Sequence, residues 1–181
     1  MLDKALIVID YTVDSVANEG KLTCGAPGQA IESKITSLIH QFLHQDQLVV
    51  FANDIHYEGD TYHPETKLFP PHNIAGTVGR ELYGSVKDAY ETNKQQCISI
   101  NKTRYSAFAG TNLHQLLQER NIHEIHLVGV CTDICILHTA VDAYNNGYKT
   151  IIYRDGVASF NEAGHQWALD HFTSTLGAKL I

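Results

Sequence analysis

Three residues with reactive side chains lie at or just beyond the ends of apolar segments. Asp10 closes the run ALIVID (5–10), Lys102 follows CISI (97–100), and Cys135 comes five residues after IHLVGV (125–130). Thiolate is the reactive form of cysteine, and a nearby cation or helix N-terminus lowers the pKa of the thiol. Lys102 can supply the cation, and Asp10 can accept the thiol proton and return it to a leaving amine. The three residues are therefore a candidate set for nucleophilic catalysis.

Each of these residues also has a purely structural explanation. Cysteine is among the most buried residue types, aspartate often starts a turn after a strand, and lysine is usually solvated. The chain has four cysteines (Cys24, Cys97, Cys131, Cys135), enough for two disulfides. The C-x-x-x-C spacing of the last two differs from the C-x-x-C of redox motifs and zinc knuckles. We therefore expect free thiols.

The elements that would position these residues are six short apolar runs with helical patterns between them. The runs are 5–10, 48–53, 97–100, 125–130, 150–155 and 178–181, and the helical patterns are 28–44, 111–121, 132–146 and 161–175. Nearly continuous apolar strands are typical of parallel sheets buried on both faces. The pattern predicts an α/β fold, a three-layer α/β/α arrangement with a mostly parallel six-stranded sheet, in one domain over residues 1–181.

A long segment between the second and third runs, residues 54–84, is rich in His, Pro, Gly and Tyr. A loop of this length inside a compact domain is usually functional. It starts at the carboxyl end of a strand, where open α/β sheets bind ligands. We expect a ligand site there.

Composition narrows the class of protein. The chain has 181 residues, 44% of them hydrophobic, and a formal net charge of -7. That charge argues against a nucleic-acid partner, and no apolar stretch is long enough to span a membrane. The N-terminus lacks the pattern of a cleaved signal peptide. We expect a cytoplasmic protein with no nucleic-acid or membrane partner.

Four segments in a fixed order carry a family resemblance: DYTVD (10–14), DIHYEGDTYHPETKLFPPH (54–72), KTRYSAFAGT (102–111) and GVCTDICILHTAVDA (129–143). They resemble the signatures of the isochorismatase-like cysteine hydrolases, a superfamily with a Rossmann-like topology. Within it, the chain is most similar to the nicotinamidases, also called pyrazinamidases. The match extends over nearly the whole chain, and the four segments are specific only together.

The resemblance implies that Asp10, Lys102 and Cys135 form a catalytic triad with Cys135 as the nucleophile. It also implies a cis Val130–Cys131 bond, with the backbone N–H groups of Cys131 and Cys135 directed at an oxyanion. The implied reaction is hydrolysis of nicotinamide to nicotinic acid and ammonia through a thioester, as in NAD recycling. Lys102 would keep Cys135 ionised and anchor Asp10.

The same resemblance implies one divalent metal ion held by Asp54, His56, Glu65 and His72. Two imidazoles with carboxylates suit zinc first, with iron or manganese as alternatives. His63 and Glu58 are rival ligands. In the family the metal binds the ring nitrogen of the substrate, which orients the carboxamide towards the nucleophile.

The implied walls of the substrate pocket are Phe69 and Tyr105. Ser15 departs from the pattern, because some family members have Phe at this position. The resemblance therefore assigns no aromatic residue to this part of the pocket wall.

Two other functions remain compatible with the sequence. One is an isochorismatase-like hydrolase acting on another small amide or carbamoyl substrate. The other is a non-catalytic binding module on the same fold. The resemblance also implies a homo-oligomer, either a dimer or a tetramer. These residues are compatible with zinc, iron or manganese, with several small amide substrates, and with a direct or water-mediated contact of Glu65 with the metal.

Overall fold

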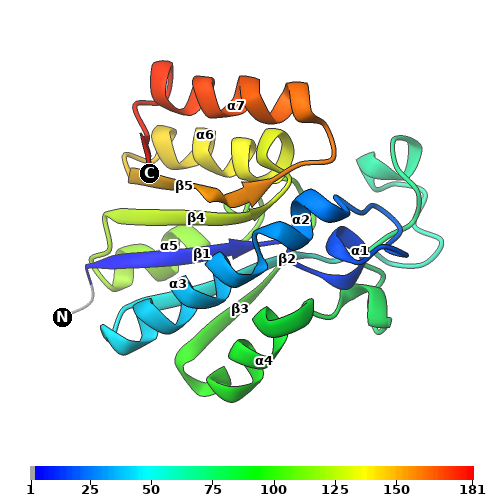
Figure 1. The fold of residues 1–181 in the computed structure, drawn as a ribbon, viewed down its shortest axis with the longest axis horizontal. Helices are drawn as coiled ribbons and strands as arrows, with labels where there is room; N and C mark the ends of the chain where they lie inside the picture. The colour runs from blue at the N-terminus through cyan, green and yellow to red at the C-terminus, as the bar shows by residue number, and fades with distance from the viewer. Residues whose placement is uncertain (1–2) are drawn as a thin grey trace.

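The computed structural model describes residues 3–181, and a six-stranded sheet lies at its centre (Figure 1). The strands are β1 (Lys4–Ile9), β2 (Leu48–Asp54), β3 (Cys97–Lys102), β4 (Glu124–Val130), β5 (Lys149–Ala158) and β6 (Lys179–Leu180). Their order is β3-β2-β1-β4-β5-β6, and every neighbouring pair is parallel. All six predicted strands are confirmed.

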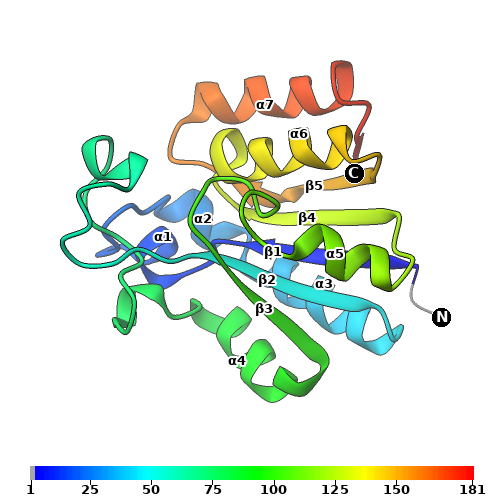
Figure 2. The same cartoon turned by 180° about the vertical axis from the view of Figure 1, so that it is seen from behind.

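Helices cover both faces of the sheet, as Figures 1 and 2 show from opposite sides. Helices α3 (Glu32–His44) and α4 (Gly84–Thr92) share one core cluster with Leu6 and Val8 of β1. Helices α5 (Leu113–Glu119), α6 (Leu137–Asn145) and α7 (Glu162–Ser174) share the other with Ile7 and Ile9. Successive residues of β1 thus enter opposite cores, as a strand buried on both faces requires. The three-layer prediction is confirmed.

Two predicted helices are interrupted. The pattern over 28–44 is divided at Ile31 into α2 (Ala26–Ala30) and α3, and the hydroxyl of Tyr11 donates to the Gly28 carbonyl oxygen at 2.7 Å. The pattern over 132–146 starts as a π-helical turn, Thr132–Ile136, before α6. The other two patterns form α5 and α7, and Asn161 caps α7 by accepting from the Gly164 N–H.

Helix α4 and the shorter α1 (Val13–Val16) were not predicted. Helix α4 buries only Val86 and Ala89, and two apolar residues are too few to show helical spacing in the sequence. Its first turn is held by Glu32 of α3, which accepts hydrogen bonds from the Ser85 N–H and hydroxyl, both at 2.7 Å. Short 3-10 turns also occur at Pro64–Lys67, Val78–Arg80 and Lys94–Gln96.

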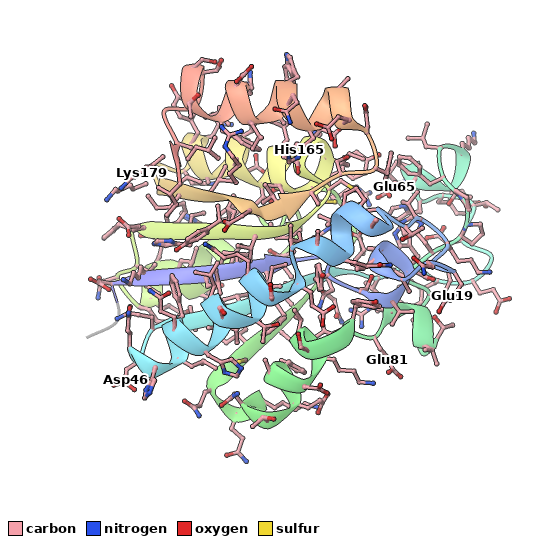
Figure 3. All side chains as sticks on the ribbon, in the orientation of Figure 1. Glu19, Asp46, Glu65, Glu81, His165 and Lys179 are labelled. Carbon is pink, nitrogen blue, oxygen red and sulfur yellow. The ribbon has the colours of Figure 1, made fainter. Side chains whose placement is uncertain are left out.

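The carboxyl ends of the strands meet at one edge of the sheet, on the right in Figure 1. The segment 55–83 extends from this edge, and Figure 3 shows its Glu65 at the end of the molecule opposite to Asp46 and Lys179. Within residues 3–181, no helix combines the length and apolar character needed to cross a membrane.

Candidate active site

The edge formed by the strand ends brings the three reactive side chains together. Asp10 directly follows β1, Lys102 is the last residue of β3, and Cys135 lies in the π-helical turn after β4. Lys102 Nζ is 2.7 Å from Asp10 Oδ2 and donates to Cys135 Sγ at 3.6 Å. All three residues are buried. The predicted convergence is confirmed, while their catalytic roles stay a prediction.

The ammonium group of Lys102 also contacts a second carboxylate, that of Asp54. Its Oδ1 is 2.5 Å from Lys102 Nζ, and its backbone N–H donates to Asp10 Oδ1 at 2.7 Å. Lys102 is fully buried, and burial disfavours its charge. Asp10 and Asp54 together outweigh that penalty, so the pKa of Lys102 is raised well above its usual value. The ammonium is therefore a permanent cation at the centre of the site.

Burial raises the pKa of Asp10 to about 6, with Asp54 adding to the rise and Lys102 opposing it. Burial also raises the pKa of Cys135 well above its usual value; Lys102 opposes this, but Asp10 and Asp54 add to it. Burial and the two carboxylates thus favour the protonated thiol, and the expectation that Lys102 keeps Cys135 ionised stays a prediction. Asp10 contacts the same ammonium as Cys135, so it is the neighbouring acceptor for the thiol proton.

The four predicted metal ligands also cluster: Asp54, His56, Glu65 and His72 each offer a ligand atom, and these atoms lie within 4.8 Å of one another. His56 Nε2 is buried and, among residues 3–181, has no hydrogen-bond partner. His72 Nδ1 lies 2.8 Å from the Pro70 carbonyl oxygen, so that nitrogen carries the proton and Nε2 is left as a donor atom. Two imidazole side chains beside two carboxylates fit a divalent cation.

The charges in this cluster agree with a cation site. Burial, followed by the neighbouring His72, lowers the pKa of His56 to about 4, so its imidazole is neutral. Burial, followed by repulsion from Asp54, raises the pKa of Glu65 to about 7. A cation would relieve the repulsion between the two carboxylates.

The two rival ligands are not in this group of four, although the ring centroid of His63 lies 4.4 Å from that of His56. His63 Nε2 lies 2.8 Å from the Thr103 carbonyl oxygen, and its Nδ1 accepts from the Glu65 N–H at 3.2 Å. Both ring nitrogens are thus occupied in holding the loop. Glu58 is exposed and lies outside the cluster. The sequence alone could not separate these residues from the ligands, because the difference depends on their hydrogen-bond partners.

A narrow pocket joins the reactive residues to the metal cluster. Phe69 and Tyr105 line it as predicted, and so does Ser15. Asn73 and Leu22 also line it and were not predicted. Asn73 directly follows a predicted ligand, His72, which was the one available signal.

Cys131 lines the same pocket, and the Val130–Cys131 peptide bond is cis, as the resemblance implies. Its Sγ lies 3.2 Å from Cys24 Sγ, and both residues are buried. All four cysteines are free thiols, as predicted. The oxyanion role of the Cys131 and Cys135 backbone N–H groups stays a prediction.

A neighbouring basic residue fixes the ends of two strands. Arg80 Nε donates to the Asp54 carbonyl oxygen at 2.9 Å, and its NH2 group donates to Asn101 Oδ1 at 2.5 Å. Arg80 therefore holds the end of β2 against the end of β3, where Asp54 and Lys102 meet. No sequence signal singled it out.

A family model and several solved structures match this chain over nearly its full length. The family model described as "Isochorismatase domain" matches residues 4–181. The crystal structure of nicotinamidase/pyrazinamidase PncA from Bacillus subtilis is 55% identical, with 99% of each chain covered and a TM-score of 0.97. The pyrazinamidase/nicotinamidase from Streptococcus mutans is 49% identical, covering 99% of this chain and 100% of that one, with a TM-score of 0.96. The pyrazinamidase of Pyrococcus horikoshii in complex with zinc is 27% identical, covering 99% and 98%, with a TM-score of 0.85.

Proposed function

Because the chain belongs to the isochorismatase family, we propose that it is a cysteine amidohydrolase that converts nicotinamide to nicotinic acid and ammonia, with pyrazinamide as a second substrate. The observation that carries the proposal is the contact of one buried ammonium, Lys102, with Asp10, Asp54 and Cys135, beside a two-histidine, two-carboxylate cluster. The likeness to the B. subtilis and S. mutans enzymes supports the choice of substrate.

The proposed reaction starts with proton transfer from the Cys135 thiol to Asp10. The sulfur bonds to the carboxamide carbon, and the carbonyl electrons move onto oxygen, where the N–H groups of Cys131 and Cys135 stabilise the oxyanion. Asp10 returns the proton to the nitrogen, the C–N bond breaks, and ammonia leaves a thioester. Water then adds to the thioester with Asp10 as base, and the acid and the thiol are released. Lys102 holds Asp10 and Cys135 in place during formation of the thioester and during its hydrolysis.

Asp54, His56, Glu65 and His72 would hold a divalent metal ion, which we propose to be zinc. A neutral imidazole at His56 and an unprotonated Nε2 at His72 support this choice, and so does the similar pyrazinamidase in complex with zinc. When bound, the metal supplies a Lewis-acid anchor for the ring nitrogen of the substrate. Phe69 and Tyr105 would contact the ring.

Domain organisation, location and assembly complete the proposal. We propose one hydrolase domain over residues 1–181, because a single sheet carries all six strands. A cytoplasmic location, a homo-oligomer and the absence of nucleic-acid partners rest on the composition and the family resemblance.

The test is an ammonia-release assay with nicotinamide, pyrazinamide and simple carbamoyl amides, before and after chelation and zinc add-back. We expect nicotinamide turnover, its loss on chelation and its return with zinc. Cys135→Ala should reduce kcat by a factor of about 10⁴ or more, since the nucleophile is lost. Cys131→Ala, which keeps the backbone N–H, is the matched control and should retain activity. Turnover of only the carbamoyl amides, or full activity in Cys135→Ala, would reject the proposal.

A further inference from the structure

The π-helical turn after β4 is held by the chain that connects β5 to α7. Val130 at the end of β4 pairs with Ala158 at the end of β5, so the residues after these two strands leave the sheet side by side. Ser159 directly follows β5 and is buried, and its hydroxyl donates to Asp133 Oδ1 at 2.7 Å. The Ser159 oxygen in turn accepts from the Asn161 N–H at 3.1 Å. The donor and acceptor in each bond are unambiguous, because a carboxylate only accepts and a backbone N–H only donates.

The first turns of α7 add two further contacts with this π-helical turn. A Cβ at Gly164 would lie 2.0 Å from Asp133 Oδ2, so the carboxylate lies directly against the helix backbone. A negative charge beside a helix N-terminus is stabilised there. His165 Nδ1 lies 2.8 Å from the hydroxyl oxygen of Thr132, which is buried, and Figure 3 labels His165 on α7. Two successive residues of the turn are therefore fixed from the α7 side.

These contacts act on the backbone between the two proposed oxyanion donors, because Asp133 lies between Cys131 and Cys135 in the sequence. The Cys131 carbonyl oxygen accepts from the N–H groups of Ile134 and Ile136, both at 3.1 Å, so the whole turn is one hydrogen-bonded unit. Donors stabilise an oxyanion best when they are held in place before its charge forms. A turn that is free to move at Asp133 would lose part of this advantage.

We propose that Asp133 is a positioning residue, whose hydrogen bond from Ser159 holds the turn in the shape that directs the N–H groups of Cys131 and Cys135 at the oxyanion. Among residues 3–181, neither Asp133 nor Ser159 belongs to the pocket lining, so both act through the backbone of the turn. This inference rests on the proposed function, because it needs an oxyanion at the carboxamide carbon.

The first test is kinetic. Asp133→Ala and Ser159→Ala each remove the bond, and kcat for nicotinamide should fall about tenfold, while KM changes less than about twofold, since the oxyanion forms after binding. The double variant should be no more than about twofold slower than Asp133→Ala, because both single changes remove the same contact. Ser85→Ala is the matched control: it loses a serine hydroxyl bond to a carboxylate, also of 2.7 Å, and Ser85 does not line the pocket. Its kcat should be unchanged.

The second test separates positioning from general stability. Zinc-loaded wild-type and variant proteins are titrated with nicotinaldehyde, in which a hydrogen replaces the amino group of the substrate. The Cys135 sulfur bonds to the aldehyde carbon, the carbonyl double bond opens, and the thiol proton passes to the oxygen, which then lies at the oxyanion position. Methylpyridine, with the ring nitrogen and no oxygen, is the comparison ligand. Thermal unfolding and zinc content are measured for every variant.

Asp133→Ala and Ser159→Ala should weaken the aldehyde about tenfold and methylpyridine less than about twofold. Unchanged kcat in both variants, equal weakening of the two ligands, or the same losses in Ser85→Ala would overturn the inference. Turnover of nicotinamide by the wild-type protein without an effect of Asp133 rejects the positioning role alone. A wild-type protein that neither releases ammonia nor forms the aldehyde adduct at Cys135 rejects both proposals.

Discussion

Lys102 determines the electrostatics of the site at the scale of single residues. Its side chain is fully buried, and its Nζ contacts Asp10, Asp54, Cys135 and the Arg104 carbonyl oxygen. Removing one partner of a buried ion pair leaves an uncompensated charge, which typically costs about 3–5 kcal/mol. The same contacts decide how the two titrating groups behave. In the proposed reaction Asp10 is the base, and its raised pKa and that of Cys135 both reflect burial beside Lys102.

The raised pKa of Asp10 gives a prediction for the pH dependence of activity. The proposed reaction needs the carboxylate form, and burial raises its pKa to about 6. As the pH falls below about 6, Asp10 takes up a proton, so kcat/KM should fall about tenfold per pH unit. The rate should be independent of pH over the unit or more above it. The measurement is kcat/KM for nicotinamide between about pH 4.5 and 8, with zinc in excess. A profile flat down to pH 4.5 would exclude Asp10 as the base.

The reactive residues and metal ligands could be predicted because their positions follow from strand ends and from a family pattern. The place of Asn73 in the pocket wall could not be, because it depends on contacts with Asp14 and Thr12 that only the fold brings about. His63 is excluded as a metal ligand by its contacts with Thr103 and Glu65, which the sequence does not reveal. The ionisation state of Cys135 stays a prediction, because burial and two carboxylates oppose the one cation that the sequence reveals.

At the scale of elements, the site depends on how closely β4 approaches β1. Gly129, one residue before the end of β4, pairs with Ile9 and has a φ of 119°. A Cβ at this position would lie 2.0 Å from the Ile9 carbonyl oxygen. Ile9 precedes Asp10, and Gly129 precedes the Val130–Cys131 segment of the pocket. The close approach of these two strands therefore sets the distance between Asp10 and the Cys131–Cys135 segment.

Gly129→Ala should be strongly destabilising, because both the backbone angle and the contact with Ile9 oppose a side chain. We expect a loss of about 3 kcal/mol or more in the free energy of unfolding, measured by denaturant titration. Gly147→Ala is the matched control: its φ is 78°, but a Cβ there has no atom within 4 Å. It should cost only about 1 kcal/mol. Equal losses in both variants would show that the strand contact is unimportant.

The strands were predictable because buried parallel strands are continuous apolar runs. Helix α4 was not, since it buries two apolar residues and its N-terminus is held by Glu32, which is 53 positions away from Ser85. The division at Ile31 between α2 and α3 was not predicted either, and the contact of Tyr11 with Gly28 in α2 comes from outside the helical pattern.

At the scale of the whole molecule, the candidate metal cluster connects the sheet to the long loop. Asp54 ends β2, whereas Glu65 and His72 come from the segment that leaves the sheet after it. A metal ion bound by all four residues would close a loop of about twenty residues, so its binding free energy adds to the stability of the folded chain.

Chelation should therefore lower the melting temperature as well as the activity. Zinc at about a hundred times its Kd adds about 2.7 kcal/mol, which for a chain of this size corresponds to about 5–10 °C. Differential scanning calorimetry with and without zinc measures the shift. His56→Ala should remove most of it, and His63→Ala, with both ring nitrogens committed to the loop, should keep it. An unchanged melting temperature of the wild-type protein on chelation would contradict a metal-holding cluster.

Asp54 belongs to both halves of the site: one of its oxygens contacts Lys102 Nζ, and the residue is one of the four candidate ligands. An ammonium and a bound metal ion would thus share one carboxylate. By thermodynamic reciprocity, protonation of Lys102 changes the free energy of metal binding by the same amount as metal binding changes the free energy of protonating Lys102. Asp54 also helps to keep the proton on Cys135. A metal bound to Asp54 would offset that contribution and leave more of the Lys102 charge for Asp10 and the sulfur. Removal of the metal should therefore make the Cys135 thiol less acidic and slower to react with thiol reagents.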